Sequence, residues 1–587
     1  MNHLRKTKII CTLGPATDDE EILRQLMQNG MNVARVNFSH GSHEEQKKRI
    51  EQFKRIREEL KLPVALLLDT KGPEIRIKTF SKGKVTLSAG ETFTLTTDEV
   101  EGTDNIVSVT YKNLNKDLKA GDTVLIDDGL IELNVVRIQG NEIVCEVKNG
   151  GDVSNNKSIN IPNAAIHLPY MSEKDRADIL FGIENDFDFI AASFVRTAYD
   201  VMEVKKILEE NNGLDIMVIS KIENQDGIRN IDEILKVSNG IMIARGDMGV
   251  EVPFEELPTI QKMLTQKCYK SGKIVITATQ MLDSMIRNPR PTRAETTDVA
   301  TAVFDGTSAV MLSGETAVGK YPVESLKTMA KIAGRTEKSI NYKENFNLNK
   351  MDTAQNVTNA ISHATCMTAH DLEASAIIAI TISGATARMA SKFRPNCPII
   401  APTPSRKAYR QMALSWGVYP VLAEMKENSD DLFEHAVDKA LETKIVKNGD
   451  IVVIAAGIPS GTGGTTNMLK VHLVGRSLAN GTGVNELVVS GKLCVAKTDE
   501  EAATKFEEGD ILAVRSTSNL LLPIIKNAKG IITEEEGLTS HAAIVGLTLD
   551  IPVIVGVKNA TDILEHGMTV TIDSRRGCVY CGVTKVL

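Results

Sequence analysis

The chain has 587 residues and a formal net charge of -8, from 68 Lys and Arg against 76 Asp and Glu. This length predicts about four domains. Without a long like-charge block the sequence argues against a nucleic-acid-binding surface, so a phosphate-bearing partner would meet local basic sites. No apolar run reaches the roughly 20 residues of a membrane helix, and the N-terminus is a poor signal peptide because its apolar part is only strand-sized. Eight scattered cysteines indicate reduced thiols and a cytoplasmic location.

Eight short apolar runs, most of them ending in a charged or hydroxyl residue, dominate the sequence up to Glu315. Such near-continuous runs are typical of parallel strands buried on both faces, and helix-like stretches, such as 20–30 and 255–272, separate them. Eight strand–helix units predict an α/β protein with a (β/α)8 TIM barrel, whose site lies at the C-terminal ends of its strands. The runs are 8–15, 31–41, 64–76, 187–196, 215–224, 240–249, 273–282 and 308–315.

The third run is not followed directly by its helix. Residues 71–170 are rich in Thr, Val, Gly and Asp, and their alternating apolar residues, broken by turn pairs, predict a small β-barrel or sandwich. A helical pattern resumes at Ser172, a plausible N-cap. We therefore predict a barrel domain from 1–70 and 171–345, with a β-rich lid domain at 71–170 inserted over the catalytic rim.

Strands and helices alternate again in the rest of the chain. Residues 346–475 predict a separate α/β domain, and the Gly- and Asn-rich stretch 476–486 predicts a linker. A fourth domain is expected at 487–587. Its lone CxxC pair, Cys578 and Cys581, has no second pair beside it, which favours an incidental pair on a terminal strand over a zinc site.

Lys221 and Glu223 lie two residues apart at the end of the fifth run, so both side chains point to the same face of one strand. Asp247 follows the next run. Two carboxylates on neighbouring strands suit Mg²⁺, which favours one or two protein carboxylates plus substrate oxygens, and a lysine beside them supplies positive charge for a phosphoryl group in transfer or a developing enolate. The alternative is a lysine–carboxylate pair that only holds adjacent loops.

Other residues at the strand ends add groups for anions and for a second cation. The glycines around Gly246 let backbone N–H groups approach a carboxylate before a helical segment begins, and Thr279 adds a hydroxyl. Arg35 and Arg76 are the forked donors best suited to phosphates. Oxygen ligands with a single formal negative charge suit a large monovalent ion at least as well as Mg²⁺; they come from Asn37, Ser39, Asp69 and Thr70.

Six motifs occur in order: MNVARVNFSHG, LDTKGPEIR, ISKIEN, ARGDMGVE, TATQML and LSGETAVGKYP. With them the chain resembles the pyruvate kinases from about residue 1 to 475. The resemblance implies phosphoryl transfer from phosphoenolpyruvate to ADP, giving pyruvate and ATP in the last step of glycolysis. It also implies a barrel, a mobile lid, an α/β domain and a homotetramer.

The resemblance assigns a role to each matching residue of this chain. Lys221, Thr279 and Arg35 would be catalytic, and Glu223 and Asp247 would bind Mg²⁺ or Mn²⁺. Phosphoenolpyruvate would be held by Arg35, Lys221, Gly246, Asp247 and Thr279. The nucleotide would lie along Asn37, Phe38, Ser39, His40, Arg76 and Lys157. K⁺ would be bound by Asn37, Ser39, Asp69 and Thr70, and the acidic Glu74 resembles the K⁺-requiring type of the family.

The α/β domain carries a candidate effector site. Ser383 and Thr386 place hydroxyls at a helix start, which favours a phosphate cradle; the alternative is a plain helix cap. The later loop 457–467 lacks the Trp and Arg of the fructose-1,6-bisphosphate-activated animal forms. We therefore expect a phosphorylated activator, a sugar phosphate or a nucleotide, without assigning it to fructose bisphosphate.

The tail sequence EGLTSHAAIVGLTLDIPVIVGV resembles the phosphohistidine domain of phosphoenolpyruvate synthase and pyruvate phosphate dikinase. The resemblance implies that His541 carries phosphate, yet no stretch of the chain is left for an ATP-grasp-like domain to load it. Two hypotheses follow: a phosphohistidine carrier fed by phosphoenolpyruvate, and a non-catalytic module that stabilises or regulates the tetramer, which we favour.

For the main body, the rival to a kinase is a metal-dependent lyase or aldolase of the enolate-forming barrels. That reading explains carboxylates around Mg²⁺ but neither the lid nor the nucleotide-facing arginines. A role in binding alone leaves Lys221 without a purpose.

Overall fold

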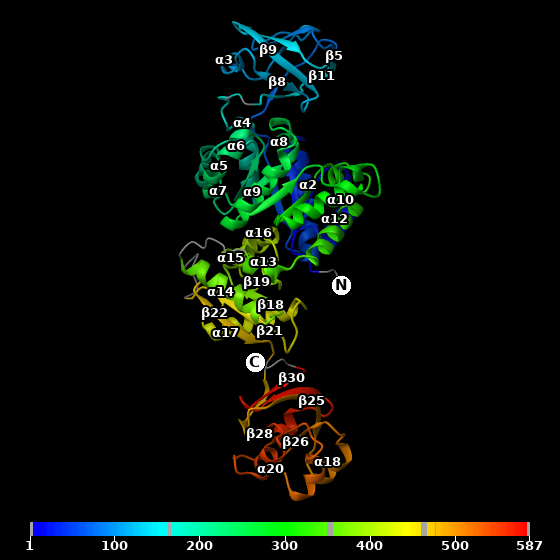
Figure 1. Cartoon of the computed structure of the whole chain (residues 1–587), viewed down its shortest axis with the longest axis vertical. Helices are drawn as coiled ribbons and strands as arrows, with labels where there is room; N and C mark the ends of the chain where they lie inside the picture. Colours follow the sequence, from blue (N-terminus) through cyan, green and yellow to red (C-terminus); the bar gives the residue numbers. More distant parts are fainter. Residues whose placement is uncertain are drawn as a thin grey trace. The chain divides into compact units, whose positions relative to one another are not determined.

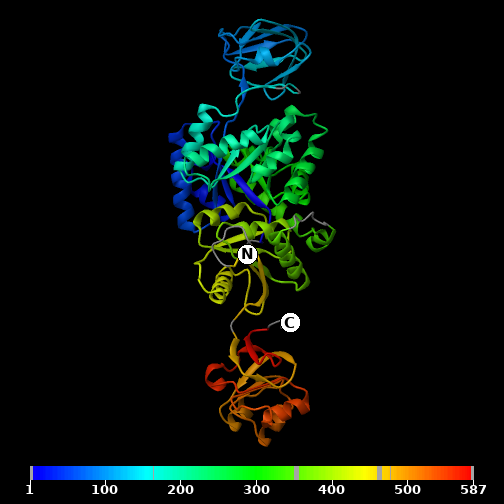
Figure 2. The same cartoon turned by 90° about the vertical axis from the view of Figure 1, so that its left-hand side faces the viewer.

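The computed structural model describes residues 4–162, 164, 166–348, 356–458, 466–475 and 477–583 (Figures 1 and 2). Its contacts divide the chain into two compact units. The first comprises Met1–Ala354, Ser383–Arg394 and Ser405–Pro420, and the second comprises Gln355–Ile382, Pro395–Pro404 and Val421–Leu587. Within the part of the chain that is described, no helix combines the length and the apolar character needed to cross a membrane.

The eight apolar runs form the strands of a closed parallel barrel in the first unit, as the sequence predicts. Around the barrel the strands follow one another in the order β1-β17-β16-β15-β14-β13-β3-β2. Their residues alternate between two apolar cores: Leu67 packs inside the barrel, and its neighbours Leu66 and Leu68 pack outward under the helices. The strands are β1 (Lys8–Thr12), β2 (Val33–Asn37), β3 (Ala65–Asp69), β13 (Phe189–Ala192), β14 (Met217–Ile222), β15 (Gly240–Ala244), β16 (Ile274–Ala278) and β17 (Ala309–Leu312).

Helices surround this barrel (Figure 2). The helix expected after the lid begins as predicted, because Ser172 Oγ accepts a hydrogen bond from the backbone N–H of Asp175 at 3.0 Å. The longer helices of the layer are α1 (Glu20–Gln28), α2 (His43–Leu60), α4 (Glu173–Glu184), α5 (Ala198–Glu210), α9 (Leu257–Ser271), α10 (Arg293–Phe304) and α12 (Pro322–Glu337). Shorter ones are α6 (Gln225–Arg229), α7 (Ile231–Val237), α8 (Arg245–Glu251), α11 (Gly314–Ala317) and α13 (Tyr342–Leu348).

A β-rich insertion with its own apolar core separates β3 from α4, as the sequence predicts. Its main sheet has the order β4-β12-β8-β9-β10-β6-β7, and β11 and β5 form a separate pair. The first and last strands of the insertion, β4 and β12, pair with each other, with Ile75 opposite Ile159 and Arg76 opposite Ser158. Its elements are β4 (Ile75–Arg76), β5 (Lys84–Leu87), β6 (Thr92–Thr96), β7 (Ile106–Ser108), α3 (Leu114–Asp117), β8 (Thr123–Ile126), β9 (Ile131–Gln139), β10 (Glu142–Val147), β11 (Gly151–Ser154) and β12 (Ser158–Asn160).

A five-stranded sheet of order β20-β19-β18-β21-β22 follows in the chain, where the α/β domain was predicted. Its strands are β18 (Ala376–Ala379), β19 (Ile399–Thr403), β20 (Val418–Leu422), β21 (Ile451–Ala456) and β22 (Met468–Leu473). The helices of this stretch are α14 (Val357–Asp371), α15 (Ala385–Lys392), α16 (Arg406–Gln411) and α17 (Ser429–Glu442).

The tail forms an eight-stranded sheet of order β23-β30-β29-β25-β26-β27-β28-β24. The predicted linker is wrong for 477–483, because this segment forms β23 and β24, which pair with β30 and β28. The strands are β23 (Ser477–Asn480), β24 (Thr482–Gly483), β25 (Val488–Val495), β26 (Ile511–Val514), β27 (Gly530–Thr533), β28 (Val553–Val555), β29 (Thr569–Asp573) and β30 (Cys578–Cys581). The helices are α18 (Asp499–Lys505), α19 (Leu522–Ile525), α20 (His541–Leu549) and α21 (Ala560–Ile563).

Candidate active site

A cavity of about 370 Å³ lies at the C-terminal ends of the barrel strands, and both the barrel and the lid line it. It brings together predicted site residues that are far apart in the sequence: Arg35, Asn37, Ser39, His40, Arg76, Lys157, Lys221, Glu223 and Asp247. The same wall contains Lys71, Glu74, Asp127, Asp128, Ser158, Ser193 and Phe194. We call this space the rim cavity.

Lys221 is the buried centre of the rim cavity. Its Nζ donates hydrogen bonds to Asp69 Oδ1 at 3.0 Å and to Ser193 Oγ at 2.7 Å, and it lies 3.1 Å from Glu223 Oε1. Burial opposes the charged form, but the carboxylates of Asp69 and Glu223 outweigh it and raise the pKa of Lys221. The site therefore keeps an ammonium ion in a place from which water is largely excluded.

Glu223 presents one oxygen that the protein leaves available. Its Oε2 accepts a hydrogen bond from the backbone N–H of Phe194 at 2.6 Å, whereas the buried Oε1 receives no hydrogen bond of normal geometry despite its approach to Lys221. Burial raises the pKa of Glu223 to about 7, even though Lys221 lies beside it.

A divalent metal ion fits this donor set. Glu223 and Asp247 line the same cavity from β14 and α8, and Mg²⁺ typically takes one or two protein carboxylates and completes its shell with water and phosphate oxygens. No cluster of three or more metal-ligating side chains occurs in the described ranges. The remaining ligands would therefore be substrate and solvent oxygens.

Arg35 is fixed by its neighbours on adjacent strands. Its Nε donates to Asp69 Oδ2 at 2.5 Å and its Nη1 donates to Thr12 Oγ1 at 3.0 Å. Despite complete burial, the pKa of Asp69 is lowered because Arg35 and Lys221 both favour its ionised form. Asp69 thus orients the two cations of the cavity at once.

The four residues predicted for K⁺ gather at the ends of β2 and β3, where Asn37 lies opposite Asp69 in the sheet register. Asn37 and Ser39 line the rim cavity, but Asp69 and Thr70 lie behind its wall, 0% and 4% exposed. Thr70 Oγ1 accepts a hydrogen bond from the backbone N–H of Ser193 at 3.1 Å. Of these four residues, only Asn37 and Ser39 therefore line the rim cavity in this structure.

The cations on the lid side of the cavity are paired with acids. Arg76 Nε donates to Glu74 Oε2 at 2.8 Å, and its Nη1 donates to the carbonyl oxygen of Asn156 at 2.6 Å. Lys157 Nζ lies 2.8 Å from Asp127 Oδ1. A bound nucleotide would compete with these acids for the same cations.

The glycine-rich segment around Asp247 is part of a helix rather than a turn before one. The helix α8 begins at Arg245, whose guanidinium bonds Asp298 and the carbonyl oxygen of Thr279. A Cβ on Gly246 would lie 2.9 Å from Thr279 Cγ2, so the close contact requires glycine. Gly246 and Thr279 therefore adjoin each other, although neither lines the rim cavity.

Two residues near the strand ends have buried side chains with structural contacts. Phe38 buries its ring at 2% exposure against Phe181 and Phe187, so its side chain cannot contact a nucleotide. Glu315, at the end of the eighth run, accepts backbone hydrogen bonds from Leu282 and Ser313 and holds two loops together.

Sequence reasoning missed Ser193, Asp127 and Asp128. Ser193 directly follows β13, so the polar residue at a strand end was a usable signal, and its Oγ connects Lys221, Asp69 and the carbonyl oxygen of Thr70. Asp127 and Asp128 sit in a lid turn with φ of 55° and 54°. They reach the cavity only through the folding of the lid, and nothing local marks them.

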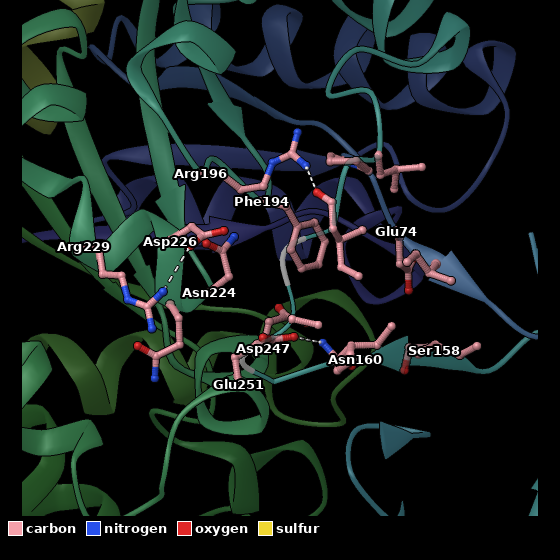
Figure 3. Close-up of a pocket in the computed structure, with 18 residues that line it drawn as sticks. Glu74, Ser158, Asn160, Phe194, Arg196, Asn224, Asp226, Arg229, Asp247 and Glu251 are labelled. Carbon is pink, nitrogen blue, oxygen red and sulfur yellow. Dashed lines mark hydrogen bonds and ion pairs between the residues drawn. The ribbon is translucent and has the colours of Figure 1, made fainter. Parts of the chain in front are cut away.

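A second cleft, of about 190 Å³, adjoins the rim cavity at the hinge of the lid (Figure 3). The two spaces share Glu74, Ser158, Phe194 and Asp247. In this cleft Asn160 Nδ2 of the lid donates to Glu251 Oε1 of α8 at 2.9 Å. The helix that carries Asp247 is thereby tied to the last strand of the lid.

The predicted effector residues lie at the start of α15. Gly384, the N-cap, has φ of 80°, and the Ser383 carbonyl oxygen accepts a hydrogen bond from Arg388 Nη2 at 3.0 Å. Thr386 is 7% exposed, so the hydroxyl expected in the cradle lies under the surface. Of the loop 457–467, residues 459–465 lie outside the described residues.

His541 is the first residue of α20, whose N-cap Ser540 accepts a hydrogen bond from the backbone N–H of Ala543. Its Nδ1 lies 2.9 Å from Thr517 Oγ1 and its Nε2 lies 3.2 Å from Asn519 Oδ1. Because Asn519 Oδ1 can only accept, this contact uses a proton on Nε2. Both partners of the imidazole are neutral.

Comparison with known proteins places three family models along the chain. The pyruvate kinase barrel domain matches residues 4–326, the pyruvate kinase alpha/beta domain matches 359–472, and the mobile domain of PEP-utilising enzymes matches 506–577. Among relatives, a pyruvate kinase of Sporosarcina psychrophila is 50% identical over 586 residues, 100% of both chains. A pyruvate kinase of Geobacillus stearothermophilus is 51% identical over 585 residues, 99% of this chain and 100% of the relative. A crystal structure of a pyruvate kinase from Cryptosporidium parvum superimposes with a TM-score of 0.77 at 39% identity, covering 80% of this chain and 96% of its own.

Proposed function

This chain belongs to the pyruvate kinase family and is a phosphotransferase, and we propose that it transfers the phosphoryl group of phosphoenolpyruvate to ADP. The P–O bond to the enolate oxygen breaks, a bond to the terminal ADP oxygen forms, and the enolate takes up a proton at its methylene carbon to give pyruvate. The observation that carries this proposal is the buried ammonium of Lys221, kept charged by two carboxylates and facing a cavity with further cations.

Each residue of the rim cavity contributes a distinct interaction to this reaction. Lys221 supplies positive charge where the phosphoryl group becomes more separated from both oxygens, the point at which fixed charge lowers the barrier most. Arg35, held by Asp69 and Thr12, directs its remaining N–H groups toward a phosphoryl oxygen. Glu223 and Asp247 would hold Mg²⁺ or Mn²⁺, which neutralises phosphate charge when bound.

The lid supports nucleotide binding over the lyase or aldolase alternative. Arg76 and Lys157 reach into the rim cavity from β4 and the residue before β12, and an enolate-forming lyase has no use for them. The test is ATP formation from phosphoenolpyruvate and ADP in the presence of Mg²⁺. Consumption of phosphoenolpyruvate that is independent of ADP would favour the lyase reading.

The monovalent ion is part of the same proposal. The acidic Glu74 leaves room for a compensating K⁺ near Asn37 and Ser39, although its carboxylate also bonds Arg76. With Glu74→Lys, a fixed ammonium would replace the ion, so activity in K⁺-free buffer should rise relative to the parent. A parent enzyme already fully active without K⁺ would contradict the assignment.

The proposal extends to a phosphorylated activator, a sugar phosphate or a nucleotide, at Ser383 and Thr386. Support comes from the backbone N–H groups at the start of α15. Thr386→Glu would place a like charge there and should abolish activation while leaving basal turnover. Unchanged activation would move the effector elsewhere.

For the tail we propose a non-catalytic module rather than a phosphate carrier. Thr517 and Asn519, which hydrogen-bond the His541 ring, are neutral, so neither of them adds positive charge for a phosphoryl group in transfer. Acid-labile, base-stable phosphate on His541 after incubation with phosphoenolpyruvate would contradict this. Three further points stay predictions: the homotetramer, the cytoplasmic location and the domain borders, which are 1–70 with 171–345, 71–170, 346–475 and 487–587. Light scattering tests the tetramer.

A further inference from the structure

A second group of buried cations lies in the first unit, away from the rim cavity. A narrow chamber there is lined by Lys273, Arg388, Lys392 and Arg394, and none of the described residues along its wall is acidic. It holds about 20 Å³, space for one water-sized group, and Lys273 Nζ donates to the Ser238 carbonyl oxygen at 2.8 Å. Lys273, Arg388 and Arg394 meet no acid among the described lining residues, and buried cations in such surroundings are costly unless an anion joins them.

Several donors in this chamber have no partner in the protein. Arg394 is 9% exposed, and its Nε and Nη1 are buried without a hydrogen bond, while its Nη2 bonds the Gly306 carbonyl oxygen and Ser308. Ser415 is 3% exposed and its Oγ is also without a partner. Arg388 Nη1 is a third such group. Buried polar groups normally find a partner, so the arrangement indicates a ligand that accepts hydrogen bonds.

Titration behaviour agrees with this geometry. Burial lowers the pKa of Arg388 and of Arg394 to about 10, and it also lowers the pKa of Lys273 and Lys392. A bound anion would reverse these shifts because it favours the charged form of each group.

The narrow chamber adjoins a larger one of about 320 Å³. Tyr269, Arg394 and Trp416 line both, and the Arg394 guanidinium lies 4.5 Å from the centre of the Trp416 ring and 5.7 Å from that of Tyr269. Tyr342 adds a third aromatic wall. Asp305, which lies 4.0 Å from Lys262, is the one acidic residue among the described residues of this wall. The paired chambers thus offer cations at one end, and flat rings with a hydrogen-bond acceptor at the other.

We propose that the paired chambers form a binding site for a phosphate monoester, with the phosphate among Lys273, Arg388, Lys392 and Arg394 and the organic part against Tyr269, Tyr342 and Trp416. To admit the phosphate, the lysine heads move outward on their flexible stems. A phosphate dianion matches the excess of cations and the forked arginine donors, and an aromatic chamber of this size suits a ring. The site is separate from the Ser383 and Thr386 cradle, which lies at the start of α15, whereas Lys392 is its last residue.

The chain carries its own reporter for this site, because Trp416 is the one tryptophan in the sequence. Titrating the full-length protein at constant ionic strength with inorganic phosphate, adenosine 5′-monophosphate and glucose 6-phosphate should change Trp416 fluorescence saturably. If one ester binds more tightly than inorganic phosphate, its organic part occupies the larger chamber. This result also shows whether the natural ligand is a nucleotide or a sugar phosphate. No saturable change with any of the three probes would overturn the proposal.

Variants at the chamber's edge locate the anion. Lys273→Met and Lys392→Met should each weaken binding at least about tenfold, since each removes a charged hydrogen-bond donor. Lys267→Met is the matched control. Lys267 lies in the last turns of α9, shortly before Lys273 in the chain, where it pairs with Asp232 and lines neither chamber. Wild-type affinity in both edge variants would overturn the proposal.

A third variant separates this site from the effector cradle. Thr386→Glu should leave the Trp416 titration intact even if it abolishes activation. If it removes the fluorescence response while Lys273→Met does not, the anion binds in the cradle and the proposed site is wrong.

Discussion

The rim cavity and the tail histidine are both candidate sites of phosphoryl chemistry, and they differ in what surrounds the reactive nitrogen. Lys221 Nζ contacts Asp69, Ser193 and Glu223, which come from three different barrel strands or the residues just after them. His541 contacts Thr517 and Asn519, two neutral residues of one loop. Charge that must be stabilised during transfer needs fixed charges around it, and the contacts of Lys221 include such charges whereas the two hydrogen-bond partners of His541 are neutral.

Removing the ammonium group of Lys221 should have the largest effect on the kinase reaction. Lys221→Met is expected to lower kcat by about 10²–10³-fold or more, by analogy with the loss of one electrostatic donor, while phosphoenolpyruvate still binds through the metal and Arg35. Steady-state ATP formation measures the loss, and thermal melting checks the fold. Lys71→Met, at the same cavity wall but outside the Lys221 network, should cost far less. Wild-type turnover in Lys221→Met would remove that residue from the mechanism.

The metal carboxylates should show the next largest effect. Glu223→Gln and Asp247→Asn are expected to raise the Mg²⁺ concentration for half-maximal activity at least about tenfold, since loss of even an outer-shell partner can cost that much. Activity titrations with Mg²⁺ measure it. Asp226→Asn, which changes an acid of the hinge cleft that does not line the rim cavity, is the control. If the Mg²⁺ titrations of both carboxylate variants overlay that of the wild type, the metal binds elsewhere.

The raised pKa of Glu223 makes the stability of the rim cavity depend on pH. In the metal-free protein the folded state holds a proton up to about pH 7, whereas the unfolded chain releases it near the ordinary value of 4.5. The stabilising contribution of this group is therefore full below pH 4.5 and is lost as the pH rises through about 7. Melting curves of the wild type and Glu223→Gln across this range should converge at low pH and separate at high pH. Added Mg²⁺ should raise the melting temperature of the wild type more than that of Glu223→Gln, because the metal competes with the proton for the Glu223 carboxylate. The difference between the two proteins at high pH should therefore become smaller.

The smallest effect on catalysis is expected from the tail. His541→Ala should keep the turnover of the parent, because no step at the rim cavity uses that imidazole. A chain ending at Gly475 should also retain turnover and lose thermal stability or shift its effector response; the Cryptosporidium parvum enzyme is matched over 96% of its length by 80% of this chain. A fall in ATP synthesis in His541→Ala as large as that in Lys221→Met would make the tail catalytic.

The barrel was predictable because each strand carries its signal locally, as an apolar run with a polar end. The same reasoning failed at 477–483, where Gly and Asn suggested a linker. There the strands β23 and β24 are defined by pairing with β30 and β28, far away in the sequence, and not by their own apolar pattern. Partners that are distant in the chain leave no local trace.

The candidate site divides in a similar way. Arg35, Lys221 and Glu223 could be placed in one cavity because the ends of barrel strands converge at one rim. The pairing of Arg76 with Glu74, and the withdrawal of Asp69 behind the cavity wall, could not be predicted. Asp69 is held there by side chains from neighbouring barrel strands, and this side-chain packing is not recorded in any local sequence pattern.

The strands β4 and β12, which begin and end the lid, are hydrogen-bonded to each other as an antiparallel ribbon. The strand β12 also pairs with β8, so both connections between the lid and the barrel belong to the main sheet of the lid. The chain therefore leaves and re-enters the barrel through one hydrogen-bonded ladder, and the two connections move together rather than independently. Arg76 and Ser158 are opposite each other on that ladder, and both line the rim cavity, so any movement of the lid connections is transmitted directly to the cavity wall.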